Sequence, residues 1–308
     1  MHDGIAGDGA MAAISCLQLP PTCGSAGTSS CCDSSVVPGG TFYRSYDVAG
    51  DASSGTTSFP ATISGFRLDL YEVTVGRFRA FVNADMGTLP RAPAAGAGAH
   101  AHIPGSGWDP AWNASLPADT AALVASVSCN TGYQTWTNAA AANESLPINC
   151  VSWFDAFAFC AWDGGYLPTE TEWNYAAAGG GDQRAYPWSV PAGTLQIDVS
   201  YANYNPSAST CINGASGMLE RVGSKSPKGD GPWGHADLAG NVKEWVLDGF
   251  TTYANPCTDC AELTTIAQRT LRGGSFVDAA SCARAVTRGS NDPAMNIPAF
   301  GFRCARSP

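Results

Sequence analysis

The chain has 308 residues, 44% of them hydrophobic, and 16 Lys and Arg against 26 Asp and Glu give it a formal net charge of −10. A chain of this length and apolar content can bury a large core, so global disorder is excluded. The acidic balance argues against a track for nucleic-acid phosphates and against adhesion to an anionic membrane. The 35 Gly and 20 Pro are scattered without a period, which favours a loop-rich fold over collagen or a helical bundle.

The chain contains 12 cysteines. A high, even count in a Gly-rich chain is typical of proteins from oxidising compartments. We therefore expect a secreted, periplasmic or cell-surface protein. The first residues show neither a basic n-region nor an apolar h-region, so we expect that a leader was removed or left out of this chain. No apolar run approaches the roughly 20 residues of a membrane helix, and we do not expect a membrane-spanning protein.

The composition changes once along the chain. Residues 1–36 are Gly/Ala/Ser-rich and almost without large apolar side chains, but they contain Cys16, Cys23, Cys31 and Cys32. Such a segment depends on cross-links for its structure. The sequence predicts a flexible, Cys-rich N-terminal appendage over 1–36 and one domain over 37–308. Within that domain, the Ala/Gly/Pro-rich residues 90–107 predict a long surface loop.

The first regular elements are predicted by periodicity. Residues 66–71 alternate between apolar and other side chains, which indicates a half-buried strand. Thr74 then has the place of a helix N-cap. The helix that follows has apolar residues on one face, namely Val75, Phe78, Phe81 and Val82.

Two further helices are predicted by their capping residues. Ser152 and Asp155 have the spacing of a capping box and begin a second helix. Thr169 and Glu172 have the same spacing at the start of a third, short helix that ends near Gly179. Beyond it we expect short strands and Gly-punctuated loops.

Several short motifs follow one another along the domain. In chain order they are Glu72-Val73-Thr74, Val151-Ser152-Trp153, Leu167-Pro168-Thr169-Glu170-Thr171-Glu172-Trp173, Tyr186-Pro187-Trp188, Asp237-Leu238-Ala239-Gly240-Asn241-Val242 with Glu244-Trp245, Arg272-Gly273-Gly274-Ser275-Phe276 and Gly301-Phe302-Arg303. The series resembles the formylglycine-generating enzyme family, also called the sulfatase-modifying-factor domain, over roughly residues 37–306. The resemblance implies a compact α+β fold with little regular secondary structure, related to the C-type lectin fold, and often one or two structural calcium ions.

The founding activity of that family oxidises a substrate cysteine with oxygen. It uses a pair of cysteines shortly after the Arg-Gly-Gly-Ser motif as ligands for copper(I), an ion that soft thiolates suit. In this chain the two positions hold Asp278 and Ala283, or Ser275 and Ala280, depending on the end from which the segment is counted. Only Cys282 lies nearby. One thiolate does not make a two-sulfur site, so we expect neither copper nor formylglycine generation, and Cys282 is the one catalytic candidate.

We expect the remaining cysteines to form disulfides. The resemblance implies one pair between the second helix and the residue after Gly-Phe-Arg. A Cys-Thr-Asp-Cys motif can close a local loop; its alternative as a metal or redox site needs a second pair or a thioredoxin-like unit, and neither is evident. A third pair would bracket the segment before the second helix, and the last would consume the candidate thiol. The expected pairs are Cys160–Cys304, Cys257–Cys260, Cys129–Cys150 and Cys211–Cys282.

The resemblance also implies where calcium would bind. Hard oxygen ligands would come from the Asp237 carboxylate and from the carbonyls of Leu238, Gly240 and Val242. Asn241 and Glu244 are adjacent alternatives as ligands, and the other possibility is that Asp237 only caps this turn. A weaker second site would use Asn203 and the carbonyl of Tyr204, and its other half falls in residues 211–217, where no matching Asp is present.

The histidines offer a different metal hypothesis. His100 and His102 form a His-Ala-His pair, which we expect to lie in a solvated loop without nearby carboxylates. His235 precedes the presumed calcium turn, and we expect a structural role for it. No Gly-x-Ser-x-Gly, P-loop or Rossmann motif is present.

Three functional hypotheses remain. The first is an exported, non-catalytic relative of the formylglycine-generating enzymes that binds a peptide, glycan or protein partner in a groove near Ser275 and Arg288. The second is a metal-dependent oxidase of the formylglycine-generating or non-haem iron kind, using His100, His102 or Cys282. The third is a structural component of an extracellular assembly.

Overall fold

The structure is a computed structural model that describes residues 13–308 except 21, 212–216 and 265–266. Its α-helices are α1 (Val75–Asn83), α2 (Thr120–Val127), α3 (Trp153–Trp162) and α4 (Glu170–Ala178). The 3₁₀ helices are η1 (Ile14–Cys16), η2 (Leu89–Arg91), η3 (Pro110–Ser115), η4 (Gly180–Asp182) and η5 (Ala280–Ala283). The strands are β1 (Ser34–Val37), β2 (Gly40–Tyr43), β3 (Pro60–Ile63), β4 (Phe66–Asp69), β5 (Lys243–Gly249), β6 (Cys257–Thr258), β7 (Arg269–Arg272), β8 (Arg288–Asn291), β9 (Phe300–Gly301) and β10 (Ala305–Arg306).

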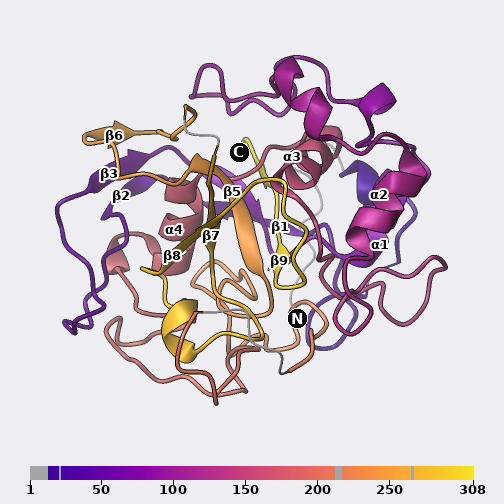
Figure 1. Cartoon of the computed structure of the whole chain (residues 1–308). Coiled ribbons are helices and arrows are strands. Elements are labelled where there is room, and N and C mark those ends of the chain that lie inside the picture. Colours follow the sequence, from indigo (N-terminus) through magenta and orange to yellow (C-terminus); the bar gives the residue numbers. More distant parts are fainter. Residues whose placement is uncertain (1–12, 21, 212–216, 265–266) are drawn as a thin grey trace.

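The described strands form three small sheets, ordered β1-β4-β10, β2-β3-β6 and β8-β7-β5-β9. Helix α4 packs against β5 and β7, while α1 contacts both α2 and α3 on the other side of the molecule (Figure 1). The α+β class predicted from the sequence is confirmed. No helix of the described ranges is both long and apolar enough to span a bilayer.

The capping residues act as predicted. The Thr74 side chain accepts a hydrogen bond from Arg77 N at the start of α1. Capping boxes are present at the start of α3 and of α4, and α4 ends at Gly179, whose φ of 67° is left-handed. Each cap satisfies backbone N–H groups that would otherwise be buried without a partner, which fixes where the helix begins.

Aromatic side chains of α1 and α3 fill the larger core. The rings of Phe78 and Phe159 stack with centroids 5.9 Å apart, and Trp153, at the start of α3, is fully buried. Trp153 Nε1 donates to Val246 O on β5 at 2.8 Å, so the core is tied to the four-stranded sheet.

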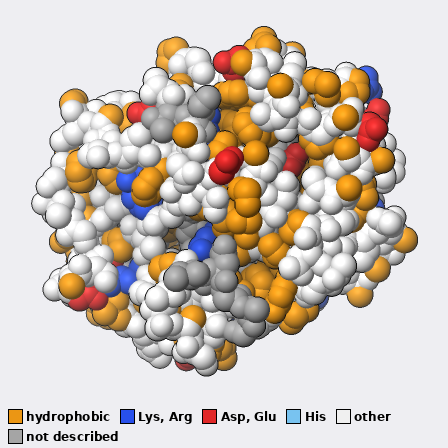
Figure 2. All heavy atoms as spheres, viewed as in Figure 1, with side chains coloured by type: hydrophobic (Ala, Val, Ile, Leu, Met, Phe, Trp, Pro, Cys, Tyr) orange, Lys and Arg blue, Asp and Glu red, His pale blue; other side chains and the backbone are white. Residues whose placement is uncertain are grey.

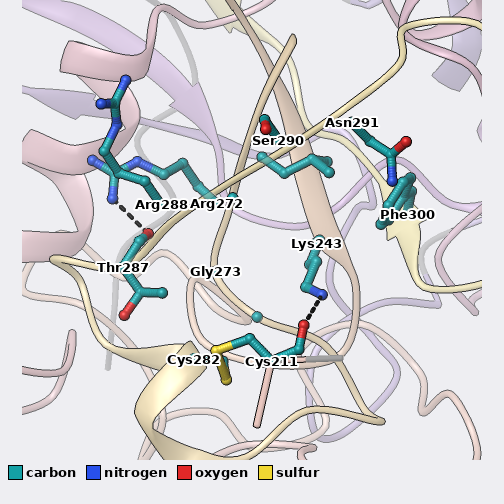
Figure 3. A pocket seen from close by; sticks show the side chains of 13 residues that line it. Cys211, Lys243, Arg272, Gly273, Cys282, Thr287, Arg288, Ser290, Asn291 and Phe300 are labelled. Atoms are coloured by element: carbon teal, nitrogen blue, oxygen red, sulfur yellow. Dashed lines mark hydrogen bonds between the residues drawn. A yellow bond between two sulfur atoms is a disulfide. The ribbon is translucent and has the colours of Figure 1, made fainter. Parts of the chain in front are cut away.

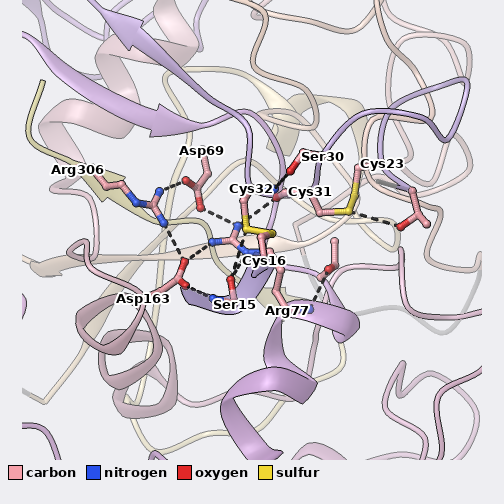
Figure 4. The surroundings of a disulfide bond; sticks show 12 residues. Ser15, Cys16, Cys23, Ser30, Cys31, Cys32, Asp69, Arg77, Asp163 and Arg306 are labelled. Carbon is pink, nitrogen blue, oxygen red and sulfur yellow. Dashed lines mark hydrogen bonds and ion pairs between the residues drawn. A yellow bond between two sulfur atoms is a disulfide. The ribbon is translucent and has the colours of Figure 1, made fainter. Parts of the chain in front are cut away.

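The described part of the N-terminal segment lies against the domain (Figure 4). Arg77 is fully buried, and it pairs with Asp69 Oδ2 at 2.8 Å and with Asp163 Oδ2 at 2.7 Å. The same guanidinium donates to Ser15 Oγ at 3.0 Å, and Ser15 N donates to Asp163 Oδ1 at 2.7 Å. Disulfides Cys16–Cys32 and Cys23–Cys31 close this segment, and β1 continues it into a sheet beside β4. Residues 1–12 of the predicted appendage lie outside the described residues.

The structure of residues 90–127 differs in part from what the sequence predicted. The predicted surface loop is mostly exposed, but His100 and Ile103 are buried in it. Helix α2 was not predicted, because its run of Ala and Val has no alternation of apolar and polar side chains. Its N-cap Asp119 accepts from Ala122 N, a signal that the sequence does contain.

Candidate ligand-binding site

A cavity of about 270 Å³ opens at one face of the four-stranded sheet. Figure 3 shows side chains from all four of its strands around this cavity, and Figure 2 shows Lys and Arg side chains around a hollow on this face of the molecule. The register of the sheet explains the grouping, because Arg272 pairs with Arg288 across β7 and β8, and Lys243 pairs with Phe300 across β5 and β9. The lining residues are Cys211, Lys243, Leu271, Arg272, Gly273, Gly274, Cys282, Thr287, Arg288, Gly289, Ser290, Asn291 and Phe300.

A disulfide between Cys211 and Cys282 forms one wall of the cavity. The glycines of the Arg-Gly-Gly-Ser motif make room for it. Gly274 has a φ of 69°, and a Cβ there would lie 2.9 Å from the backbone of Cys282. A side chain at this position would collide with backbone as well as strain the turn. The motif therefore brings the chain after β7 close against η5.

Lys243 forms an ion pair at the floor of the cavity. Its Nζ atom lies 3.0 Å from Asp278 Oδ1 and donates to Cys211 O at 3.3 Å. Ser275 Oγ donates to the other carboxylate oxygen of Asp278. Asp278 and Ser275 are almost completely buried, whereas 13% of the Lys243 side chain is exposed. The carboxylate thus lies behind the wall and the ammonium group faces the cavity.

Two arginines on the opposite wall converge on Glu170, the first residue of α4. Arg288 pairs with Glu170 in a bidentate way, with Nε–Oε1 and Nη2–Oε2 distances of 2.6 and 2.7 Å. Arg272 Nε lies 3.1 Å from Glu170 Oε1, close enough for an ion pair but not aligned for a hydrogen bond. Tyr253 OH also donates to Glu170, at 3.0 Å. Glu170 is buried, so its charge holds both arginines in place from behind the cavity wall.

Asp248 on β5 lies next to this group. Its two carboxylate oxygens accept from Glu170 N at 2.7 Å and from Glu262 N at 2.9 Å. Burial, and next the charge of Glu170, raise the pKa of Asp248 to about 7. The carboxyl group is a structural acceptor for two loops and does not line the cavity.

The two groove residues predicted from the sequence occupy different places. Arg288 lines the cavity, but Ser275 does not, because its hydroxyl is turned to the buried Asp278. Sequence reasoning missed Lys243 and Glu170. Lys243 lies between Val242 and Glu244, and Glu170 follows Thr169, so both residues belong to motifs identified in the sequence. Neither motif indicates which way the side chain points.

The turn predicted to bind calcium lies against Asn203, a residue of the weaker second site. Asn241 N donates to Asn203 O at 2.8 Å, and a Cβ at Gly240 would lie 2.4 Å from that same oxygen. Asp237, Glu72 and Glu244 are buried near one arginine, Arg303, which pairs with Glu244 at 2.7 Å. Burial, and next the neighbouring Asp237 and Glu244, raise the pKa of Glu72 well above its usual value. The cluster thus has an excess of negative charge that a divalent cation would balance.

Two carboxylates at this turn accept hydrogen bonds from N–H groups. Asp237 Oδ2 accepts from Gly223 N at 2.6 Å, and Glu72 accepts from Val242 N at 3.1 Å and from Asn241 Nδ2 at 2.6 Å. In the described part of the chain, no group of three or more His, Cys, Asp or Glu side chains is arranged to hold a metal. The predicted calcium site needs one carboxylate and three backbone carbonyls, so it stays a prediction, and residues 212–216 of the weaker site lie outside the described residues.

The prediction that His100 lies in solvent without a nearby carboxylate was wrong. His100 is buried, and its Nε2 atom lies 3.1 Å from Glu172 Oε1, the carboxylate that also caps α4. His102 N donates to His100 Nδ1 at 3.1 Å, but the His102 side chain is exposed, as expected for a solvated loop. Burial opposes protonation, but the hydrogen bond and charge of Glu172 raise the pKa of His100. Neither histidine lines the cavity. His235 is likewise buried, with Nε2 3.3 Å from Leu68 O.

The described cysteines all form disulfides. The four pairs expected for the main domain, Cys160–Cys304, Cys257–Cys260, Cys129–Cys150 and Cys211–Cys282, are those that the structure contains. With the two pairs near the N-terminus there are six. The cysteine nearest to the Arg-Gly-Gly-Ser motif is therefore not a thiol.

Comparisons with solved structures agree with this architecture. The chain matches the structure of PvdO from Pseudomonas aeruginosa with a TM-score of 0.59 at 21% identity, covering 89% of this chain and 94% of that one. It matches Treponema denticola variable protein 1 with a TM-score of 0.56 at 19% identity, covering 89% and 95%. At these identities the two likenesses show a common fold.

Sequence comparisons identify the family. The chain is 33% identical over 289 residues to the formylglycine-generating enzyme of Streptomyces coelicolor, covering 87% of each protein. It is 36% identical over 167 residues to the inactive C-alpha-formylglycine-generating enzyme 2 of Mus musculus, covering 53% of this chain and 49% of that protein. The family model of the sulfatase-modifying factor enzyme 1-like domain matches residues 21–308. The chain therefore belongs to the sulfatase-modifying-factor, or formylglycine-generating enzyme, family.

Proposed function

We propose that this protein is an exported, non-catalytic member of its family that binds a peptide, glycan or protein partner in the cavity beside β7 and β8. The observation that carries the proposal is the disulfide between Cys211 and Cys282 in the cavity wall. The activity of formylglycine-generating enzymes depends on a thiolate pair that holds copper(I). A sulfur in a disulfide is not a thiolate and does not ligate the ion in that way.

The neighbouring side chains do not replace the missing thiolates. The family positions hold Asp278 and Ala283 by one count and Ser275 and Ala280 by the other. The alanines offer no ligand atom. Asp278 is a hard oxygen donor, and both of its oxygens are engaged, by Lys243 and by Ser275. A cationic ammonium group 3.0 Å from the carboxylate also opposes a metal ion there. The site therefore does not fit copper.

Family membership is compatible with lost activity. One of the relatives carries the name inactive C-alpha-formylglycine-generating enzyme 2 and is 36% identical to this chain over the region matched. Export is supported by the six disulfides, since such bonds persist in oxidising compartments. Calcium at the Asp237 turn is part of the proposal as a structural ion, and the buried excess of carboxylates supports it.

A peptide assay tests the loss of activity. The protein is incubated with a Cys-x-Pro-x-Arg peptide, copper(I) and oxygen, and the peptide is followed by mass spectrometry. We expect no aldehyde product above the level of a Cys282→Ser variant. Product above that level would contradict the proposal and restore an oxidase.

A second assay tests binding. The native protein is presented to arrays of peptides and glycans, together with an Asn291→Trp variant, in which the larger side chain fills part of the cavity. We expect retention of a ligand by the native protein and its loss in the variant. A Lys228→Gln variant, changed outside the cavity, is the matched control. Retention that is equal in all three proteins would place the binding site elsewhere.

A further inference from the structure

We infer that the ligand of this cavity is a small monocarboxylate carried on an apolar body, of the size of one amino-acid residue. The inference rests on the proposed function, since it names the ligand class of the same site. It follows from the charge of the walls, the hydrogen-bond donors that remain free, and the apolar remainder of the lining.

The walls carry positive charge only. Among the described residues that line the cavity, Lys243, Arg272 and Arg288 are cationic and none is acidic. The carboxylates that balance them, Glu170 and Asp278, have side chains only 2% and 1% exposed and lie behind the walls. Arg44 and Asp248 add one charge of each sign beside Glu170, so the cavity keeps an excess of one positive charge. A single negative charge on the ligand balances it.

The hydrogen-bond donors show where that charge would lie. The Lys243 ammonium group has three N–H bonds, and two are used, by Asp278 and by Cys211 O. The third has no acceptor in the described part of the chain. Asn291 accepts from Asp292 N through Oδ1, and its Nδ2 group likewise has no described acceptor. Three of the five guanidinium N–H groups of Arg288 are used, by Glu170 and by Thr251 O, and this side chain is held against Glu170. Lys243 and Asn291 are therefore the groups that would bind a carboxylate directly, and the two remaining N–H groups of Arg288 are further donors.

The rest of the lining is largely apolar, apart from the Thr287 and Ser290 hydroxyl groups, which donate to Ser281 O and Gln268 Oε1. Leu271, Phe300 and the Cys211–Cys282 disulfide offer neither charge nor strong hydrogen bonds. Sugar hydroxyls are commonly bound by acceptors as well as donors, and no carboxylate lines these walls to accept from them. An aliphatic or aromatic body fits this surface better than a sugar ring does. The volume of about 270 Å³ suits a body no larger than one residue.

The charge of the whole chain restricts the ligand further. With a net charge of −10, the protein repels polyanions at long range. The cavity charge is local, so a single carboxylate is attracted where a sulfated polysaccharide or a nucleic acid is not. The occupant that satisfies these conditions is the carboxylate end of a peptide or a free N-acylated amino acid.

Two isosteric probes test the inference. N-acetyl-leucine and N-acetyl-leucinamide have the same body and differ in the carboxylate. Binding of each to the full chain is measured by calorimetry at low and at physiological salt, and the site is located by NMR shift changes. We expect the carboxylate to bind roughly tenfold more tightly, as one charge-assisted hydrogen bond implies, and to weaken with salt.

Three variants and one control connect the preference for the carboxylate to individual residues. In Lys243→Gln the preference for the carboxylate should disappear, and in Lys243→Arg it should persist. If Lys243→Gln does not fold, Asn291→Ala should weaken carboxylate binding severalfold and leave the amide unchanged. Lys228→Gln, outside the cavity, should change nothing.

Several results would overturn the inference. They are equal binding of the two probes, a carboxylate preference that survives Lys243→Gln, and the absence of either probe from the cavity. None of these affects the loss of activity, which only the peptide assay tests. Aldehyde formation, conversely, would refute the proposed function while the preference between the two probes could still be measured.

Discussion

The Nζ atom of Lys243 lies 3.0 Å from Oδ1 of Asp278, and this pair stands at the cavity floor, beside the disulfide. Removing the cation leaves a carboxylate buried without its partner. We expect Lys243→Met to lower the free energy of unfolding by about 3 kcal/mol. The double variant Lys243→Met/Asp278→Asn should lose less free energy of unfolding, because the amide at position 278 would still accept from Ser275 but would carry no charge. Urea unfolding checks both. A double variant that is less stable than Lys243→Met would show that the ion pair is not the source of the loss.

Calcium at the Asp237 turn would bind the folded chain only and raise its melting temperature. At a calcium concentration a hundred times Kd, the gain is about 2.7 kcal/mol. We therefore expect a chelator to lower the melting temperature of protein prepared with calcium, and calcium to restore it. An Asp237→Ala variant should not respond. If the native protein does not respond either and contains no calcium by elemental analysis, the assignment is wrong.

The disulfides should differ in how much they stabilise the chain. Cys160 and Cys304 are separated by 144 positions, and Cys257 and Cys260 by 3. In the chain-entropy model the first bond stabilises by about 5 kcal/mol and the second by about 2 kcal/mol. Replacing both cysteines of each pair by alanine should therefore cost about 3 kcal/mol more for the long loop. Equal losses in guanidinium unfolding would mean that local packing, and not loop closure, sets the effect.

The ionisation of Asp248 should lower the free energy of unfolding as the pH rises. Its pKa is raised from 3.8 to about 7 in the folded protein, chiefly by burial. The folded state thus binds the proton of Asp248 more tightly than the unfolded state does. The resulting contribution to the free energy of unfolding is fully present below about pH 4 and is lost as the pH rises to about 7. Asp248→Asn loses an acceptor at every pH but does not ionise. The variant should be less stable than the native protein at pH 4, and the difference should shrink by pH 8. A constant difference over this range would contradict the raised pKa.

The sequence predicted those features of the fold that depend on residues close together in the chain. Capping pairs such as Ser152 and Asp155 act between neighbours in the chain, so their spacing was sufficient to place the helices. The α+β class and the family followed from the order of the motifs. Helix α2 was missed because short apolar runs have no diagnostic period.

The cavity could not be predicted in the same way. Lys243 and Cys282 come from distant segments that the sheet and a disulfide bring together. Ser275 was expected in the groove, yet its hydroxyl turns to Asp278, a choice that depends on packing. His100 was expected in solvent, but Glu172 lies 72 positions away along the chain and within hydrogen-bond distance of it. Contacts of this length are set by the fold and not by neighbouring residues.

The proposed loss of activity depends on the disulfide in the cavity wall, at the place where the family's activity needs thiolates. A thiol count with peptide mapping tests it most directly. Native protein is unfolded without reductant, alkylated and digested, and each cysteine peptide is examined by mass spectrometry. We expect no alkylated cysteine and a cross-linked peptide that joins Cys211 to Cys282. Alkylation of both Cys211 and Cys282 in protein isolated from an oxidising compartment would show that the two sulfurs are thiols and would contradict the proposed loss of activity.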